Sequence, residues 1–224
     1  MQNVGGNCRE IHKNHTNYII MDFELENRLS KYLQEDKINK AIEIVQNDLK
    51  ELPITIFHNF LDKNFLSSTD KLINYISSTY ERCKKDIYNT LQTDTKAFYT
   101  ETEDFTCNFD SLTLNFFGFK EYKGLEDTNW LAADDYFEHN NEFEITEAKS
   151  ILNLFKEYED KELSLDENCE KSFTLTYYLV LLRVQELYRN AIIESRILQK
   201  EWATIPFLIT CHDSEFIYDS SNLK

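Results

Sequence analysis

Glycine and proline are scarce: the 224-residue chain contains only four Gly and two Pro. Because these residues most often break helices and form tight turns, their scarcity favours long regular elements. It also leaves no Gly-rich loop for a phosphate group, since neither G-x-x-x-x-G-K-[ST] nor G-x-G-x-x-G occurs. The motifs G-x-S-x-G and H-E-x-x-H are missing as well. The sequence therefore carries no motif that names a reaction, and we expect a protein that is not an enzyme.

Closely spaced cysteines and long apolar runs are also missing. The five cysteines lie far apart with no C-x-x-C pair, which disfavours a disulfide framework and a zinc knuckle. We expect reduced thiols, a cytoplasmic location, and neither cofactor nor metal. The longest apolar run, Tyr177–Leu182, is far shorter than the roughly 20 residues that span a bilayer. The N-terminus has no continuous apolar stretch, so no secretory signal is expected.

Apolar residues spaced three and four apart predict helices in the first ninety residues. The pattern runs from Asp22 to Glu51, with a break at Glu35–Asp36 where Asp36 is expected to cap a second helix. Ser67–Asp70 is expected to cap a third helix. The apolar stripe of that helix is Leu72 or Ile73, Ile76, Tyr80, Cys83 and Ile87.

The period then changes to the alternation of strands. Lys96–Phe119 is rich in Thr and Phe, with Glu101–Asp104 as the expected turn of a hairpin. Trp130–Phe137 is predicted as a further strand, and Phe207–Asp219 as a C-terminal β-hairpin. On the 112–117 strand, one face would carry Leu112, Leu114 and Phe116 and the other Thr113, Asn115 and Phe117.

Two further helices complete the prediction. One runs from Thr146 to Tyr158, and a long one from about 172 to 200 is apolar nearly all round its first half, which is typical of a buried helix. This order favours an α+β fold with a mostly antiparallel sheet over about 96–137. We predict a loosely ordered arm at 1–20 and a single domain at 21–224, divided into a helical part, 21–92, and a sheet and helix part, 93–224.

Acidic residues dominate the chain, whose formal net charge is −16. Such a surface repels nucleic acid and anionic membranes, so neither is expected as a partner. The segment Ala97–Ala148 has thirteen acids and two bases and carries −11 of that charge. The acids are Glu101, Glu103, Asp104, Asp110, Glu121, Glu126, Asp127, Asp134, Asp135, Glu138, Glu142, Glu144 and Glu147, and the bases are Lys120 and Lys123. Because concentrated like charge destabilises a fold, we expect this segment to form a contiguous acidic face that binds a basic protein.

Aromatic residues are threaded among these acids. Phe105, Phe117 and Phe137 are interpreted as the inward face of the sheet, whereas Trp130 and Tyr136 are either core residues or anchors of a protein interface. The expected partner-binding residues are Trp130, Asp134, Asp135, Tyr136, Glu138 and Glu142, with the four acids pairing with Lys or Arg of the partner.

Other polar groupings are weaker. His12 with His15, the Cys211–His212–Asp213 run with Glu215, and Asp134, Asp135, Glu138 and His139 are possible metal-binding or nucleophilic sets, but their spacing fits solvated residues better. One alternative function is a carboxylate-based hydrolase with Asp134 and Glu138 as acid and base. A third is a structural or scaffolding subunit, which would carry a large apolar patch.

In size, in acidic charge and in its α+β layout, the chain resembles the immunity proteins of bacterial polymorphic-toxin and contact-dependent inhibition systems. The resemblance extends over most of the chain and rests on no diagnostic motif, so it identifies no individual residue. It implies a protein that binds a basic toxin domain and occludes its active site.

Overall fold

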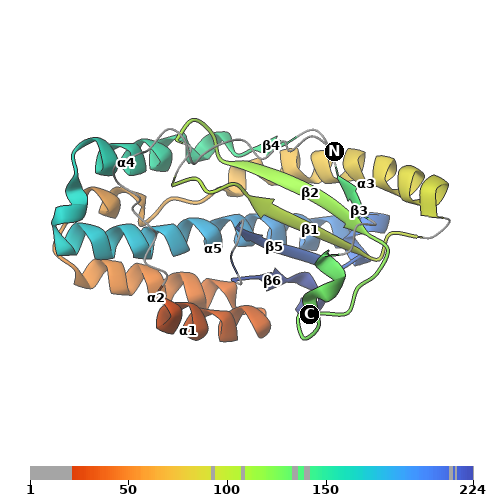
Figure 1. Ribbon diagram of the computed structural model, residues 1–224, viewed down its shortest axis with the longest axis horizontal. Coiled ribbons are helices and arrows are strands. Elements are labelled where there is room, and N and C mark those ends of the chain that lie inside the picture. The colour runs from red at the N-terminus through yellow and green to blue at the C-terminus, as the bar shows by residue number, and fades with distance from the viewer. Residues whose placement is uncertain are drawn as a thin grey trace.

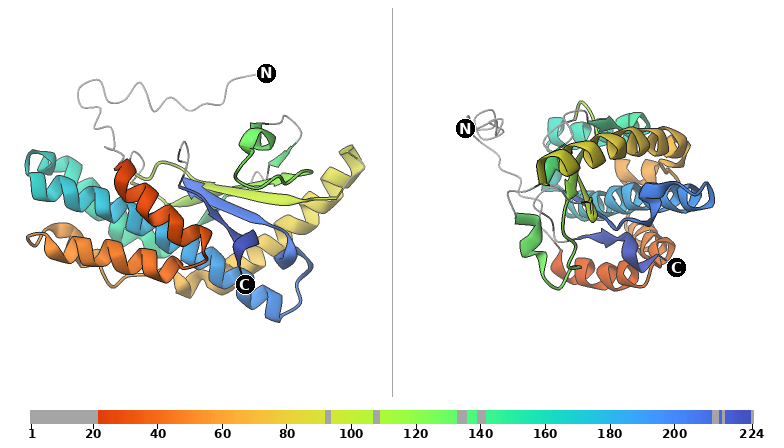
Figure 2. Two further views of the ribbon diagram at one scale, coloured as in Figure 1. Left: turned by 90° about the horizontal axis from the view of Figure 1, so that it is seen from below. Right: turned by 90° about the vertical axis from the view of Figure 1, so that its right-hand side faces the viewer.

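The computed structural model (Figure 1) describes residues 22–91, 94–106, 109–132, 136–138, 142–211, 214 and 216–223, with the backbone alone at 88–91 and 138. The arm predicted at 1–20 lies outside these residues. Figure 2 shows a twisted sheet lying on a layer of helices, so that one face of the sheet is packed and the other is turned away from the helices. The fold is α+β, as the order of sequence patterns predicted.

The predicted helices of the first part are confirmed as α1 (Phe23–Gln34), α2 (Ile38–Glu51) and α3 (Thr69–Leu91). Their apolar stripes face the core, and the whole predicted stripe of α3 is buried. Between α2 and α3 lie two short 3-10 helices, η2 (Ile56–Phe60) and η3 (Leu66–Ser68). The Thr69 hydroxyl donates to the Leu66 carbonyl over 2.7 Å, which closes the turn into α3.

Asp36 does not cap α2, so that prediction was wrong. The N-cap residue is Lys37, without a side-chain hydrogen bond, and Asp36 adopts a left-handed conformation with φ of 57°. The Asp36 carboxylate accepts hydrogen bonds from Arg189 Nε and Nη2 at 2.7 and 2.9 Å and from the Tyr218 hydroxyl at 3.0 Å. The connection between α1 and α2 is thereby joined to distant parts of the chain.

The sheet contains β1 (Ala97–Thr102), β2 (Thr113–Phe119), β3 (Tyr136–Glu138), β4 (Phe143–Glu144), β5 (Phe207–Cys211) and β6 (Tyr218–Asp219). Its order is β3-β2-β1-β5-β6, with β4 also paired to β2. Only β1 and β5 pair in parallel, so the prediction of a mostly antiparallel sheet with a C-terminal hairpin is confirmed. β1 continues through Glu101 and Thr102, so the hairpin connection starts later than predicted.

The predicted strand Trp130–Phe137 was wrong at its start, where Thr128–Ala132 forms the 3-10 helix η4. Its last two residues do join the sheet, as part of β3, and residues 133–135 lie outside the described part of the chain. The local reason is a turn in which Asp127 accepts hydrogen bonds from the backbone N–H and side-chain amide of Asn129, at 3.2 and 2.9 Å. The chain therefore turns back over the sheet instead of extending along it.

The helices α4 (Lys149–Asp160) and α5 (Glu167–Ile197) confirm the other two helical predictions. α5 begins earlier than expected because Asp166 caps it, accepting from the N–H groups of Asn168 and Cys169 at 2.8 and 3.0 Å. From Ser172 to Ser195 α5 is buried on nearly every side, because α2 and α3 flank it and the sheet covers it. Its Gln185 amide donates to the Ile209 and Phe216 carbonyls, at 3.2 and 3.1 Å, and so joins the helix to the C-terminal hairpin.

Candidate partner-binding surface

The outward side of the sheet follows from the strand register. Side chains alternate along a strand, so Phe98 on β1 and Phe116 on β2 face α3 and α5, where their rings pack at 4.8 Å. Their neighbours point the other way, and Phe117 is one of them, so the interpretation of Phe117 as an inward-facing residue was wrong. We call this side the outer sheet face: it consists of Tyr99, Glu101, Asn115, Phe117 and Phe119 on β1 and β2, Tyr136 on β3 and Glu144 on β4.

Trp130 is a core residue, only 3% exposed, in a small second cluster at one end of the outer sheet face. Its ring lies edge-on to Phe119 at 5.2 Å and to Tyr122 at 5.7 Å, and its Nε1 donates to the Gly124 carbonyl over 3.1 Å. The Tyr122 hydroxyl donates to Asp219 over 2.6 Å, which fastens residues 120–132 to β6. Of the two interpretations of Trp130, burial favours the core, and we assign it no partner contact.

Tyr136 differs from Trp130 because it is 45% exposed. Its ring packs on Phe117 at 5.6 Å and on Phe119 at 5.8 Å, so that one side of the ring contacts the sheet and the other is exposed to solvent. Glu142, at the start of the β4 segment, is exposed as well. Asp134 and Asp135 lie outside the described residues, and Glu138 is described only by its backbone, opposite Phe117 in β3. Tyr136 and Glu142 therefore keep the exposure that a partner contact requires.

Several acids of the 97–148 segment serve local structure. Asp104 accepts from the Thr106 N–H and hydroxyl, and Glu121 pairs with Lys123 at 3.0 Å. Glu147 accepts from the hydroxyls of Ser67 and Ser68, at 2.7 and 2.6 Å, next to the start of α3. Burial opposes ionisation of Glu147, but these hydrogen bonds, with those from its own backbone and Thr146, lower its pKa to about 2. Glu147 thus links the segment just before α4 to η3, just before α3. It lies away from the outer sheet face, so the predicted acidic face contains fewer acids than expected.

The acids that remain on or beside the outer sheet face are fewer. Glu101 lies opposite Asn115 in the register and accepts a hydrogen bond from the Tyr99 hydroxyl at 2.9 Å. Glu144 lies opposite Thr113 and is exposed, as are Glu103 beyond β1 and Glu142 beside β4. The arrangement is an open sheet surface with aromatic rings near its centre and carboxylates toward the end of the sheet where β4 pairs with β2.

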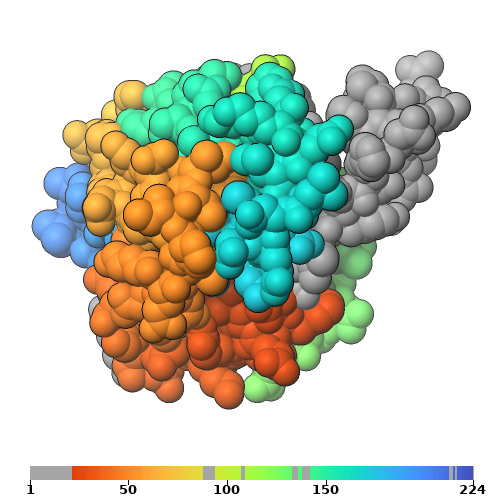
Figure 3. Space-filling model, turned by 90° about the vertical axis from the view of Figure 1, so that its left-hand side faces the viewer, coloured from red at the N-terminus to blue at the C-terminus, as the bar shows by residue number. Residues whose placement is uncertain are grey.

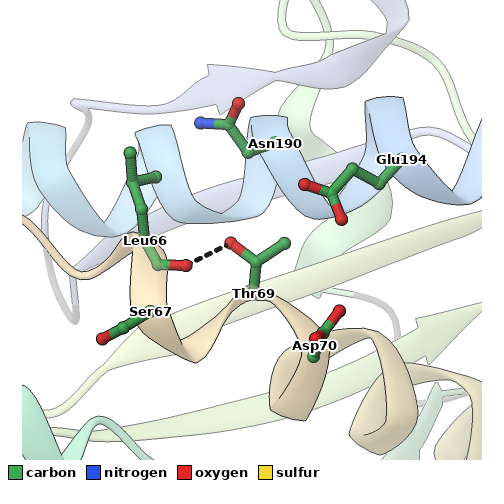
Figure 4. Close-up of a pocket in the computed structure, with 6 residues that line it drawn as sticks. All are labelled: Leu66, Ser67, Thr69, Asp70, Asn190 and Glu194. Atoms are coloured by element: carbon green, nitrogen blue, oxygen red, sulfur yellow. Dashed lines mark hydrogen bonds between the residues drawn. The ribbon is translucent and has the colours of Figure 1, made fainter.

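A separate hollow of about 390 Å³ lies between the start of α3 and the second half of α5 (Figure 4). Its walls are Leu66, Ser67, Thr69, Asp70, Asn190 and Glu194, which include two carboxylates and no basic side chain. The Asn190 amide donates to the Glu186 carbonyl over 2.9 Å. The hollow is polar and open, and nothing among the described residues indicates a ligand for it.

General acid catalysis by a carboxyl requires a raised pKa. Within the described residues, the carboxylates with a shifted pKa are Glu147, Glu167 and Glu201, and all three are shifted down. Hydrogen bonds from Lys171 and Lys84 are the largest causes for Glu167 and Glu201. None of the three fits the acid of a carboxylate hydrolase. Of the pair named for that alternative, Asp134 is not described and Glu138 is described without its side chain.

The weaker polar groupings find little support in the described part of the chain. His12, His15, His139, His212, Asp213 and Glu215 all lie outside it, while Cys211 is buried in β5. No set of three or more His, Cys, Asp or Glu within the described residues is arranged to hold a metal ion. Among the helices described, none combines the length and apolar character needed to cross a membrane.

Exposed large apolar side chains are scattered in the described structure. Ile54, 91% exposed, follows α2, and Leu165, 87% exposed, precedes α5. The end of α2 and the start of α5 lie at the end of the molecule that faces the viewer in Figure 3. Ile197 and Leu198 are exposed at the other end of α5. At 1.5 Å per residue, this long helix separates the two ends by roughly 45 Å. These residues therefore do not form the single large apolar patch expected of a scaffolding subunit.

No family model matches the chain, and neither the curated proteins nor the solved structures searched contain a match.

Proposed function

We propose that the protein is an acidic protein-binding module that neutralises a basic partner, as an immunity protein of a cognate bacterial toxin domain. The observation that carries the proposal is the outer sheet face, where half-exposed aromatic rings adjoin exposed carboxylates in the segment with a charge of −11. Tyr136 supplies an exposed aromatic contact there, and Glu142 and Glu144 supply charge. Interfaces commonly combine aromatic anchors with charges that steer the approach.

The charge acts mainly on the rate of encounter. A negative surface attracts a basic domain over distances set by the Debye length, which is about 8 Å at physiological ionic strength. Association should therefore be fast at low salt and should slow as salt is added. Once the two surfaces meet, the partner's active site is covered, so inhibition requires no chemistry from this protein.

The test uses the product of the gene that lies beside its own as the first candidate partner, purified and assayed for toxin activity. Wild type should bind it at equimolar concentration and abolish that activity. The variants Asp134→Lys/Asp135→Lys and Glu142→Lys/Glu144→Lys should each weaken binding at least tenfold.

The matched control is Glu81→Lys/Asp86→Lys, which makes the same charge change on the exposed side of α3. This control should weaken binding much less, because its charges lie on another surface. If the basic candidate is not bound, or if the control reversal weakens binding as much as the other two reversals do, the proposal is wrong.

A further inference from the structure

Three aromatic side chains form a row across the outer sheet face. Tyr99 on β1 and Phe117 on β2 are cross-strand partners whose rings lie 5.9 Å apart. Phe117 in turn meets Tyr136 of β3 edge-on at 5.6 Å. Tyr99 and Phe117 are half-buried and Tyr136 is 45% exposed, so their rings leave aromatic surface open to solvent.

Hydrogen-bond acceptors lie next to this row. Glu101 follows Tyr99 by two residues on the same face of β1, and Asn115 is its cross-strand partner on β2. The Tyr99 hydroxyl donates to Glu101 Oε2 over 2.9 Å, which holds the carboxylate at the rim of the row. Both Glu101 and Asn115 are half-buried, so a group bound beside them would be partly shielded from water.

From this juxtaposition we propose that the aromatic row with Glu101 and Asn115 is a subsite for an arginine side chain of the partner. This inference rests on the proposed function, because it names the side chain by which a basic partner is recognised. The guanidinium plane lies against Phe117 and its neighbours while its N–H groups donate to the Glu101 carboxylate and the Asn115 side-chain oxygen. A cation over an aromatic face and a charge-assisted hydrogen bond reinforce each other at such a site.

Arginine fits this surface better than lysine does. The guanidinium is planar, weakly hydrated and rich in donors, so it can stack on a ring and bind a carboxylate at the same time. The ammonium of lysine is compact and strongly hydrated, and stacking would remove part of its water. The subsite should therefore discriminate between two partners of equal charge.

The test titrates the full-length protein with two probes of equal charge, acetylated tetra-arginine amide and acetylated tetra-lysine amide. Binding is followed by the NMR signals of the aromatic rings. Wild type should bind the arginine peptide about fivefold to tenfold more tightly, with the largest shifts at Tyr99, Phe117 and Tyr136.

Two substitutions separate the contributions of ring and carboxylate. Phe117→Leu, which keeps an apolar side chain but removes the aromatic face, should reduce the arginine preference to about twofold or less. Tyr136→Leu, at a more exposed position, should reduce it in the same direction without endangering the fold. Glu101→Gln should weaken both peptides severalfold, whereas Asp86→Asn on α3, with the same charge change, should weaken them less.

Equal affinity of wild type for the two peptides overturns the inference, as does an arginine preference that survives in both Phe117→Leu and Tyr136→Leu. These outcomes are distinct from failure of the proposed function. A preference for the arginine peptide without inhibition of a toxin domain would leave the subsite in place. Inhibition of a toxin domain without that preference would remove the subsite alone.

Discussion

Gly118 is the position where a single methyl group should disturb the fold most directly. It lies in β2, where the sheet approaches α3, and a Cβ atom added there would fall well inside van der Waals distance of Cys83 Sγ. Ile87 and Phe98 would also lie within 3.5 Å of it. Cys83 is fully buried on α3, with its sulfur 3.5 Å from the Thr95 hydroxyl, and has little room to move. Gly118→Ala should therefore force the strand and the helix apart.

The expected cost combines two opposing effects. Overpacking a well-packed core costs about 1–3 kcal/mol, and the contact with a rigid helix favours the upper part of that range. Alanine restricts the unfolded chain more than glycine does, which offsets about 0.4–1 kcal/mol. The net loss of unfolding free energy should be about 2 kcal/mol, which for a chain of 224 residues lowers Tm by about 4 °C.

The assay is urea unfolding of wild type, Gly118→Ala, Cys83→Ala and the double variant. Because Cys83→Ala removes the sulfur that the new methyl group meets, the double variant should be more stable than the sum of the single effects by at least 1 kcal/mol. A loss below 0.5 kcal/mol in Gly118→Ala, or strict additivity of the two substitutions, would refute the packing described at this position.

Three further outcomes follow from other contacts. Arg189→Lys removes the paired hydrogen bonds to the mostly buried Asp36 and should lower the free energy of urea unfolding by about 2 kcal/mol. Its control is Arg183→Lys, which alters an ion pair within α5. The pKa of Glu147 is lowered to about 2 when folded, so its ionised form stabilises the fold above the ordinary value of 4.5 and this contribution is lost as pH falls. Tm should thus fall less steeply between pH 5 and pH 2 in Glu147→Gln than in wild type, and parallel curves would contradict the contact. Tyr122→Phe loses the hydrogen bonds to Asp219 and Ser221, which should lower the free energy of unfolding by about 1 kcal/mol. The fluorescence of Trp130 should also shift toward that of a solvated indole, and an unchanged spectrum would argue against a role of Tyr122 in keeping Trp130 buried.

The helices were predictable because their signal is local. The stripe from Leu72 to Ile87 repeats at the helical period, and each member was expected to be buried whatever it packed against. The alternation in β2 likewise separated Leu114 and Phe116 from Asn115 and Phe117 correctly. The high density of negative charge in the 97–148 segment could also be read directly from the sequence.

What could not be predicted depends on residues far apart in the chain. Asp36 had the local signature of a helix cap, but Arg189 and Tyr218, more than 150 positions later, take its carboxylate instead. Trp130 had a pattern suited to a strand, yet the buried cluster with Phe119 and Tyr122 requires a turn there. In the sequence, Glu147 could not be distinguished from the other twelve acids of the segment. Its hydrogen bonds from Ser67 and Ser68, about 80 positions earlier in the chain, are visible only in the structure.

The central claim is that the outer sheet face is the surface that meets the partner. Hydrogen exchange of the complex, followed by mass spectrometry, tests it directly by comparing peptides that cover 97–119 and 136–147 with those from α1 and α2. The account predicts slower exchange on binding in the sheet peptides, most of all at β3 and β4, and little change in the two helices. Protection confined to α1 and α2, with the sheet peptides unchanged, would contradict it.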